Sequence, residues 1–206
     1  MLTLKSVFLL QYVQAFDLSL DGANMTNDTP ISQLIRLAKS GDQGAFRALY
    51  ERYGARLYRF FLAYGVDTDM ANDLVNETFI RLWEHLDAYQ ERDRFEGYLF
   101  RIARNLLIDK QRQENRFLPL DDRPRQEKRI SPEENAIQQE NLEDLHKALQ
   151  KLKPDYRTVL ILRFFYDYTP AQVAQVMERS EGAVRVLQHR ALQALRKEIA
   201  RQKREV

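Results

Sequence analysis

The sequence predicts an all-α protein. Of its 206 residues only seven are glycine and six are proline, too few for the many tight turns of an all-β chain. Long stretches are rich in Leu, Ala, Arg, Gln and Glu, which favour helix. Apolar residues recur at intervals of three and four, the period of a helix with one buried face. We therefore expect amphipathic helices arranged in one or two domains.

The first 24 residues differ from the rest of the chain. They contain the apolar run SVFLLQYVQAF, which is shorter than the roughly 20 apolar residues that a membrane-spanning helix needs. Only Lys5 precedes it as a basic residue, and no small-residue cleavage site follows, so a signal peptide is disfavoured. Met25 opens a segment that reads like a natural beginning. We expect translation to start there and no membrane insertion; a genuine N-terminal extension remains the alternative.

Four amphipathic patterns indicate a helical domain over residues 25–115. In order they are ISQLIRLAKSG, AFRALYERYGARLYRFFLAYG, DMANDLVNETFIRLWEHLDAY and FEGYLFRIARNLLIDKQRQ. Gly41 is a plausible stop for the first. The third has the clearest period of 3.6, and its inward residues are Ala71, Leu74, Val75, Phe79, Leu82, Trp83 and Leu86.

Residues 116–138 interrupt this pattern with three prolines and many charges, as expected for a flexible linker. Residues 139–206 then form a second helical domain. It starts with ENLEDLHKALQKL, followed by PDYRTVLILRFFYD, which Pro154 can begin.

The end of this domain has the form of a helix-turn-helix. We expect a short helix at about 170–177, with Thr169 as N-cap, a turn at about 178–180, and a longer helix capped by Ser180. Val173, Val176 and Met177 should face the core, together with Val184, Leu187, Ala191 and Leu195. The outer face then carries Glu181, Arg185, Gln188 and His189, positions that reach base edges in such motifs. A solvated basic face on two packed helices is the alternative.

Charge is distributed unevenly along the chain. The total is only +2, but residues 67–91 carry −6, residues 92–116 carry +3 and residues 145–206 carry +7. The two basic segments favour a polyanionic partner. In the first of them, cations lie beside the aromatic residues Phe95, Tyr98 and Phe100, a composition suited to single-stranded nucleic acid; these cations and their polar neighbour are Arg101, Arg104, Asn105 and Arg112. Core aromatics with solvated arginines are the alternative.

The acidic helical segment 70–89 would repel phosphate, so its outer face is better suited to protein docking than to DNA. A solvated face is the default alternative. No catalytic constellation emerges from the acids or from the three histidines, His85, His146 and His189. With no cysteine and no ligand spacing, we expect no enzyme, no cofactor and no metal site.

These segments, in this order, resemble the sigma-70 family of bacterial RNA polymerase initiation factors, specifically the extracytoplasmic-function (ECF) group. The resemblance runs from about Ile31 to Lys203 and includes DLVNETFIRLWEHLDAY, FEGYLFRIARNLLIDKQRQ and the helix-turn-helix. It implies two small helical domains, a region 2 bundle and a region 4 helix-turn-helix, joined by a flexible linker. It also implies a cytoplasmic, non-enzymatic factor that binds core polymerase and directs promoter-specific initiation.

The resemblance assigns roles to three sets of residues. The first set docks on the polymerase β′ clamp helices: Asp73, Asn76, Glu77, Arg81 and Glu84. The second recognises and opens the −10 element: Phe95, Tyr98, Arg101, Arg104, Asn105, Asp109 and Arg112. The third recognises the −35 element in the major groove: Ser180, Glu181, Gly182, Ala183, Arg185, Val186, Gln188, His189 and Arg190.

Four departures from the family pattern stand out. Asn76 stands where the family usually has Gln, and Tyr98 stands where it often has Trp. Leu187 stands where many members have a basic residue, and the turn around Glu178 lacks the glycine that the family often has there. The implied partners are core polymerase, through the β′ clamp helices and the β flap, promoter DNA, and an anti-sigma factor. The alternatives are a stand-alone helix-turn-helix regulator, in which residues 31–115 serve dimerisation or sensing, and a hydrolase or nuclease, for which no residue set exists.

Overall fold

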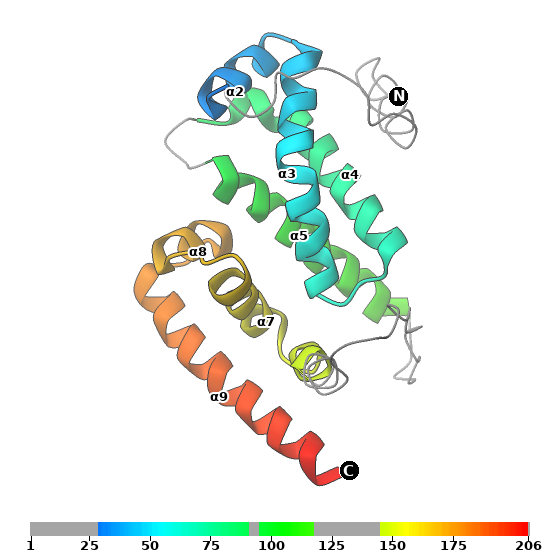
Figure 1. Cartoon of the computed structure of the whole chain (residues 1–206), viewed down its shortest axis with the longest axis vertical. Helices are drawn as coiled ribbons and strands as arrows, with labels where there is room; N and C mark the ends of the chain where they lie inside the picture. Colours follow the sequence, from blue (N-terminus) through cyan, green and yellow to red (C-terminus); the bar gives the residue numbers. More distant parts are fainter. Residues whose placement is uncertain (1–28, 91–94, 118–144, 206) are drawn as a thin grey trace, which may run out of the picture. The chain divides into compact units, whose positions relative to one another are not determined.

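The computed structural model describes residues 29–90, 95–117 and 145–205 (Figure 1). Within these ranges every regular element is a helix, which confirms the all-α prediction. The predictions for residues 1–24 and for most of the linker lie outside the described residues. The chain divides into two compact units. The first holds α2, α3 as far as Leu62, α4, η2 and α5 as far as Leu106, and the second holds Ala63–Gly65, the rest of α5 and the described residues from 145 onward.

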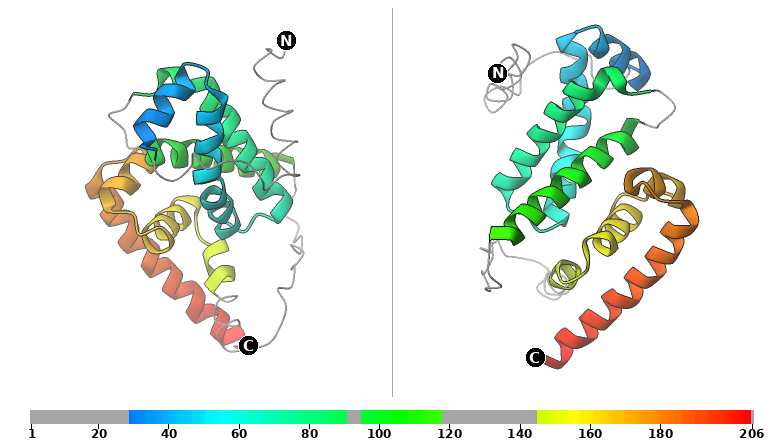
Figure 2. Two further views of the ribbon diagram at one scale, coloured as in Figure 1. Left: turned by 45° about the horizontal axis from the view of Figure 1, so that its top comes forward. Right: turned by 180° about the vertical axis from the view of Figure 1, so that it is seen from behind.

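The first unit is a helical bundle. Its elements are α2 (Ile31–Lys39), α3 (Gln43–Ala63), α4 (Thr68–His85), the short 3-10 helix η2 (Leu86–Ala88) and α5 (Phe95–Phe117). Helices α3, α4 and α5 pack together, and α2 lies at one end of them against η2 (Figures 1 and 2). The four helical patterns of the first domain are therefore confirmed.

Aromatic rings form much of the core of the first unit. Phe46 meets Phe79 and Trp83 edge-on, with ring centroids 6.0 and 4.7 Å apart. Further along α3, Phe60 meets Phe100 of α5 at 5.3 Å. Edge-to-face pairs of this kind contribute about 0.5–1.5 kcal/mol beyond the burial of their area, so they hold α4 and α5 firmly against α3.

Local signals mark where the helices of this unit begin and end. The carboxylate of Asp67 accepts a hydrogen bond from the Met70 amide at 2.8 Å and caps the start of α4. Gly41 follows α2 with φ of +91°, a conformation that favours glycine. At the other end, α5 continues to Phe117, past the predicted linker start at residue 116. No proline lies between the start of α5 and Pro119, so no proline stops the helix at 116.

The second unit begins with a helical segment at residues 145–150. Helix α7 (Pro154–Leu160) follows, with proline in its first turn as predicted. It runs into η3 (Ile161–Phe165), a π-helical turn where the sequence predicted continuous α-helix. The turn buries Ile161 and Leu162 but leaves Phe164 and Phe165 more than half exposed.

Arg157 fixes the start of this unit. Its guanidinium is buried and donates to the backbone oxygens of Leu149 (2.9 Å), Gln150 and Leu152 (3.4 Å). The last carbonyls of a helix have no partner within the helix. Arg157 therefore closes the end of the 145–150 helical segment and joins it to α7.

The helix-turn-helix has the predicted bounds. Helix α8 (Pro170–Met177) starts with a capping box between Thr169 and Gln172, and α9 (Glu181–Glu205) starts with the Ser180 hydroxyl accepting from the Ala183 amide at 3.2 Å. Figure 2 shows α8 packed at the N-terminal end of α9. The predicted core is buried at Val173, Val176, Met177, Val184 and Ala191, whereas Leu187 and Leu195 are half-buried.

The turn between α8 and α9 depends on a left-handed residue. Glu178 has φ 53° and ψ 46°, and its amide donates to the Ala174 carbonyl. This is the conformation that glycine adopts most easily at a helix C-terminus. The glycine missing from this turn is thus replaced by a glutamate that takes the same backbone geometry.

Candidate polymerase- and DNA-binding surfaces

The outer face of α4 carries exposed carboxylates. Asp73 and Glu84 are exposed and have no hydrogen-bond or ion-pair partner within the described ranges. Glu77 pairs with Arg81 one turn later, with Oε1 and Nε 3.2 Å apart, and both side chains are more than a third exposed. Such a pair contributes little to stability, so Glu77 and Arg81 remain available to a partner.

Asn76 differs from its neighbours on α4. It is half-buried, and its Oδ1 accepts a hydrogen bond from the Tyr50 hydroxyl at 3.0 Å. Tyr50 also packs against Phe79, with ring centroids 4.6 Å apart. The Asn76 side chain is thereby oriented by α3, and its amide nitrogen is the group left to meet another molecule.

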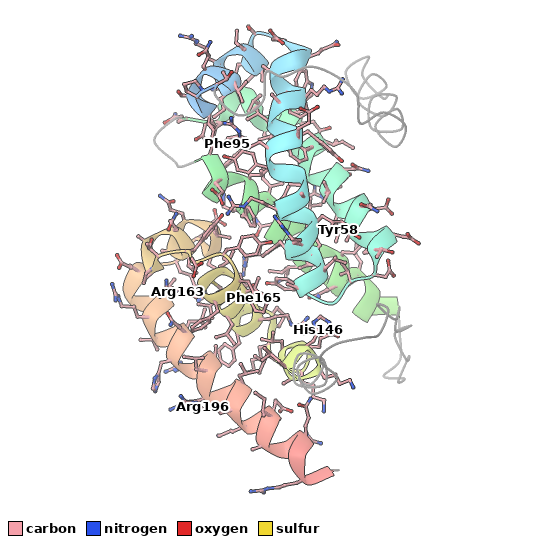
Figure 3. All side chains as sticks on the ribbon, viewed as in Figure 1. Tyr58, Phe95, His146, Arg163, Phe165 and Arg196 are labelled. Atoms are coloured by element: carbon pink, nitrogen blue, oxygen red, sulfur yellow. The ribbon has the colours of Figure 1, made fainter. Side chains whose placement is uncertain are left out.

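Phe95, at the start of α5, is a core residue. It is buried, and its ring lies 5.4 Å from that of Tyr53 and 5.8 Å from that of Tyr89 (Figure 3). The sequence predicted that Phe95 contacts DNA. The structure gives its ring a different position, beneath the surface and supporting the residues around it.

One face of α5 carries most of the predicted −10 residues. Their spacings of three, four, four and three place them along the same side of the helix; they are Tyr98, Arg101, Asn105, Asp109 and Arg112. The Arg101 guanidinium lies 5.1 Å from the centre of the Tyr98 ring, a cation–π contact. Arg104 lies beside this row and donates from Nη1 to Asn105 Oδ1 at 3.3 Å.

Burial raises the pKa of two tyrosines in this region. It raises the pKa of Tyr98, against the opposing effect of Arg101. It raises the pKa of Tyr53 to about 12, with Glu96 adding to the increase. The Tyr98 hydroxyl is a neutral hydrogen-bond donor beside the guanidinium of Arg101.

Two residues beside this surface were not among the predicted site residues. The Tyr89 ring lies 5.0 Å from that of Tyr98, and the Lys39 ammonium donates to the Tyr89 carbonyl at 2.6 Å. Tyr89 ended the acidic segment in the sequence and carried no pattern of its own. Lys39 is fifty residues away from it, so only the fold brings them together.

The start of α9 presents a polar, exposed face. The exposed residues there are Ser180, Glu181, Gly182, Ala183, Arg185, Val186, His189 and Arg190. Arg185 pairs with Glu181 at 2.5 Å, and His189 Nε2 lies 3.0 Å from the Gln193 amide nitrogen.

Gln188 is placed differently from the other predicted −35 residues. It is half-buried, and its Oε1 accepts a hydrogen bond from Arg163 Nε at 3.1 Å. Arg163, labelled in Figure 3, also donates to the Tyr168 carbonyl. Gln188 thus links α9 to η3 and to the segment before α8, and its amide oxygen is already used inside the unit.

The described residues offer neither a metal site nor a membrane-spanning helix. They contain no group of three or more His, Asp or Glu side chains that could hold a metal ion. None of the described helices is long and apolar enough to cross a membrane.

The described residues form two helical units, and the second contains a helix-turn-helix, the form of a DNA-binding module. Residues 49–117 match the family Sigma-70 region 2, and residues 142–195 match Sigma-70, region 4. The ECF RNA polymerase sigma factor SigX of Bacillus subtilis is 32% identical over 159 residues, which are 74% of this chain and 82% of SigX. The ECF RNA polymerase sigma factor SigL of Mycobacterium tuberculosis is 31% identical over 163 residues, which are 77% of this chain and 91% of SigL.

Two solved structures share the fold. CnrH, in complex with the cytosolic domain of CnrY, matches with a TM-score of 0.60 and 26% identity over 80% of this chain and 94% of CnrH. The sigma factor RpoE of Bartonella quintana, in complex with the anti-sigma factor NepR, matches with a TM-score of 0.59 and 20% identity, over 75% and 96%. At 20% identity, the similarity to RpoE shows a shared fold and nothing further.

The chain belongs to the ECF group of the sigma-70 family of RNA polymerase sigma factors. It therefore binds core RNA polymerase and promoter DNA and directs the initiation of transcription. A stand-alone helix-turn-helix regulator is not favoured, because region 2 is present together with region 4.

Proposed function

We propose that each of the three surfaces serves one step of promoter-specific initiation. The outer face of α4 docks on the β′ clamp helices, the outer face of α5 captures and holds the opened −10 strand, and the start of α9 reads the −35 element. The observation that carries this assignment is the separation of charge: exposed acids lie on α4, and exposed or half-buried arginines lie on α5 and α9. Carboxylates repel phosphate, whereas arginines bind it.

The −10 role of α5 is supported by the chemistry of Tyr98 and Arg101. Their stacked arrangement offers an aromatic face and a cation next to Asn105, which can hydrogen-bond the edge of an unpaired base. Stacking of a base on an aromatic side chain contributes about 1–3 kcal/mol, and this free energy favours strand opening. Phe95 acts beneath this surface as a support rather than as a contact.

The −35 role of α9 is supported by its exposed N-terminal turns. Arg185 can reach a base or a phosphate once it leaves Glu181, because an exposed ion pair of this kind contributes only about 0.3–0.5 kcal/mol. Gln188 serves the fold of the unit, through Arg163, rather than the reading of bases.

The remaining assignments concern bounds and partners. We propose a region 2 domain that ends with α5 at Phe117, a linker after it, a region 4 domain over residues 139–206, and action in the cytoplasm without enzymatic activity. The exposed Phe164 and Phe165 of η3 are suited to a protein contact, and we assign it to the β flap. Because RpoE of B. quintana was solved with an anti-sigma factor, we also propose an anti-sigma partner here.

Run-off transcription with the full chain, core polymerase and promoter fragments from next to its own gene tests this proposal. We expect a discrete transcript that Glu77→Lys abolishes through loss of core binding and that Arg185→Glu abolishes without loss of core binding. Matched controls are Glu51→Lys, which breaks an i,i+4 pair with Arg47 on α3, and Arg196→Glu, three turns further along α9. If a control variant reduces transcription as much as the variant it is matched to, the assignment of that surface is wrong.

A further inference from the structure

A hollow of about 480 Å³ opens in the first unit between α2 and the residue that follows η2. None of its lining residues is acidic; they are Pro30, Ser32, Gln33, Ile35, Arg36, Lys39 and Tyr89. Two cations, a hydroxyl and an amide thus share one concave surface with three apolar groups. This set of hydrogen-bond donors is suited to an anion.

Lys39 holds Tyr89 in place at one side of this hollow, through contacts with the end of η2. Its ammonium donates to the Tyr89 carbonyl at 2.6 Å and to the Asp87 carbonyl at 3.4 Å, and it lies 5.8 Å from the centre of the Tyr89 ring. These contacts join the last residue of α2 to the end of η2. Both partners are neutral carbonyls, so within the described residues the Lys39 ammonium is not paired with a carboxylate.

This side of the hollow is continuous with the proposed −10 surface. The Tyr89 ring that Lys39 holds lies 5.8 Å from Phe95 and 5.0 Å from Tyr98, which in turn stacks with Arg101. A single DNA strand that lies along α5 and continues beyond the start of this helix therefore passes next to the hollow.

Arg36 is the group in the hollow that is available to a ligand. It is exposed, and its side chain has no hydrogen-bond or ion-pair partner in the part of the chain that the structure describes. Tyr89, by contrast, is only 5% exposed and already packs against other rings, so it offers no free face for a base. The hollow is suited to a phosphate rather than to a stacked base.

We infer that this hollow binds a backbone phosphate of the single-stranded promoter DNA, with Arg36 as its ligand and Lys39 as a positioning residue for Tyr89. The inference rests on the proposed −10 role of α5. The match to Sigma-70 region 2 begins at residue 49, so Arg36 and Lys39 of α2 lie outside it. Ser32 and Gln33, both exposed, supply further hydrogen bonds to the phosphate oxygens.

The test is the salt dependence of single-strand binding by the holoenzyme. A labelled oligonucleotide carrying the non-template −10 sequence of a promoter that the holoenzyme transcribes is titrated at several salt concentrations, and binding is followed by fluorescence anisotropy. Removing one phosphate contact lowers the slope of log Kobs against log salt by about 0.7, or roughly fivefold in affinity over a tenfold range of salt. We expect this decrease for Arg36→Gln and none for Arg59→Gln, an exposed arginine of α3.

Lys39→Met tests the positioning role. We expect the affinity for the oligonucleotide to fall several-fold, while core binding and the melting temperature stay as in the wild type. Lys39→Arg, which can still donate to the Tyr89 carbonyl, should restore most of the affinity. A decrease that Lys39→Arg does not restore, or one that accompanies a lower melting temperature, overturns the positioning role.

The outcomes separate this inference from the function on which it rests. If the wild-type holoenzyme binds the oligonucleotide and Arg36→Gln keeps the wild-type slope, the phosphate site is wrong and the −10 role of α5 stands. If the wild type does not bind the oligonucleotide, the −10 role itself fails. Binding of dTMP to the wild-type chain with the same dependence on Arg36 would assign the hollow to a free nucleotide and overturn its assignment to the strand.

Discussion

Replacing Glu178 with glycine should stabilise the second unit. Glu178 has φ 53° and ψ 46° in the turn of the helix-turn-helix, and a left-handed conformation costs a non-glycine residue about 1–2 kcal/mol. Glycine is free of this strain but loses more backbone entropy on folding, about 0.5–1 kcal/mol. The difference leaves a net gain of roughly 0.5–1 kcal/mol for Glu178→Gly.

Thermal unfolding of the full chain, followed by circular dichroism, measures this gain. For a unit of 60–100 residues, 1 kcal/mol raises the melting temperature by about 4–8 °C, so we expect an increase of roughly 2–8 °C for the transition of this unit. Glu178→Ala removes the same carboxylate but keeps the strained backbone, and it should show no increase. A melting temperature that rises equally in both variants would assign the effect to charge and refute the conformational reasoning.

Three further predictions concern buried and half-buried groups. The pKa of Tyr53 is raised to about 12 in the fold, so the unfolded chain loses this proton at a lower pH than the folded chain does. The free energy of unfolding should therefore fall between about pH 10 and 12. Tyr53→Phe should flatten that part of the pH dependence, measured by urea titration. Arg157→Met leaves four carbonyls, those of Tyr64, Leu149, Gln150 and Leu152, without this donor and should destabilise the second unit by about 2–4 kcal/mol in the same titration. Gln188→Ala breaks the bond to Arg163 and should lower the melting temperature more than Arg185→Ala does, while Arg185→Ala weakens binding to −35 duplex more.

The helix-turn-helix could be predicted to the residue because its boundaries are local. Thr169 and Pro170 start α8, and Ser180 starts α9, each through contacts within three residues. The left-handed turn at Glu178 could not be predicted, since glutamate rarely takes that conformation and the residue was noted only for not being glycine. The π-helical turn at 161–165 likewise has no local signal, because it depends on which apolar residues the unit buries.

Tertiary contacts decided what the sequence left open at the proposed binding surfaces. Periodicity predicted that Gln188 faces outward, but its position beside Arg163 of η3 turns the amide inward. Phe95 lies beside basic residues in the sequence, yet Tyr53 and Tyr89 enclose its ring. Composition near a helix predicts which residue types meet DNA; the side on which each one lies follows from its packing partners.

The ion pair at the start of α9 bears on how a sigma factor avoids the wrong DNA. Glu181 holds Arg185 at 2.5 Å in the free chain, so this arginine is partly neutralised before any DNA arrives. Any DNA group that binds Arg185 must first displace this carboxylate at a cost of about 0.3–0.5 kcal/mol, and a correct base edge that offers two acceptors returns about 1–3 kcal/mol. If Arg185 reads the −35 element as proposed, this cost is repaid at the promoter and not at competing genomic sites that offer no such base edge.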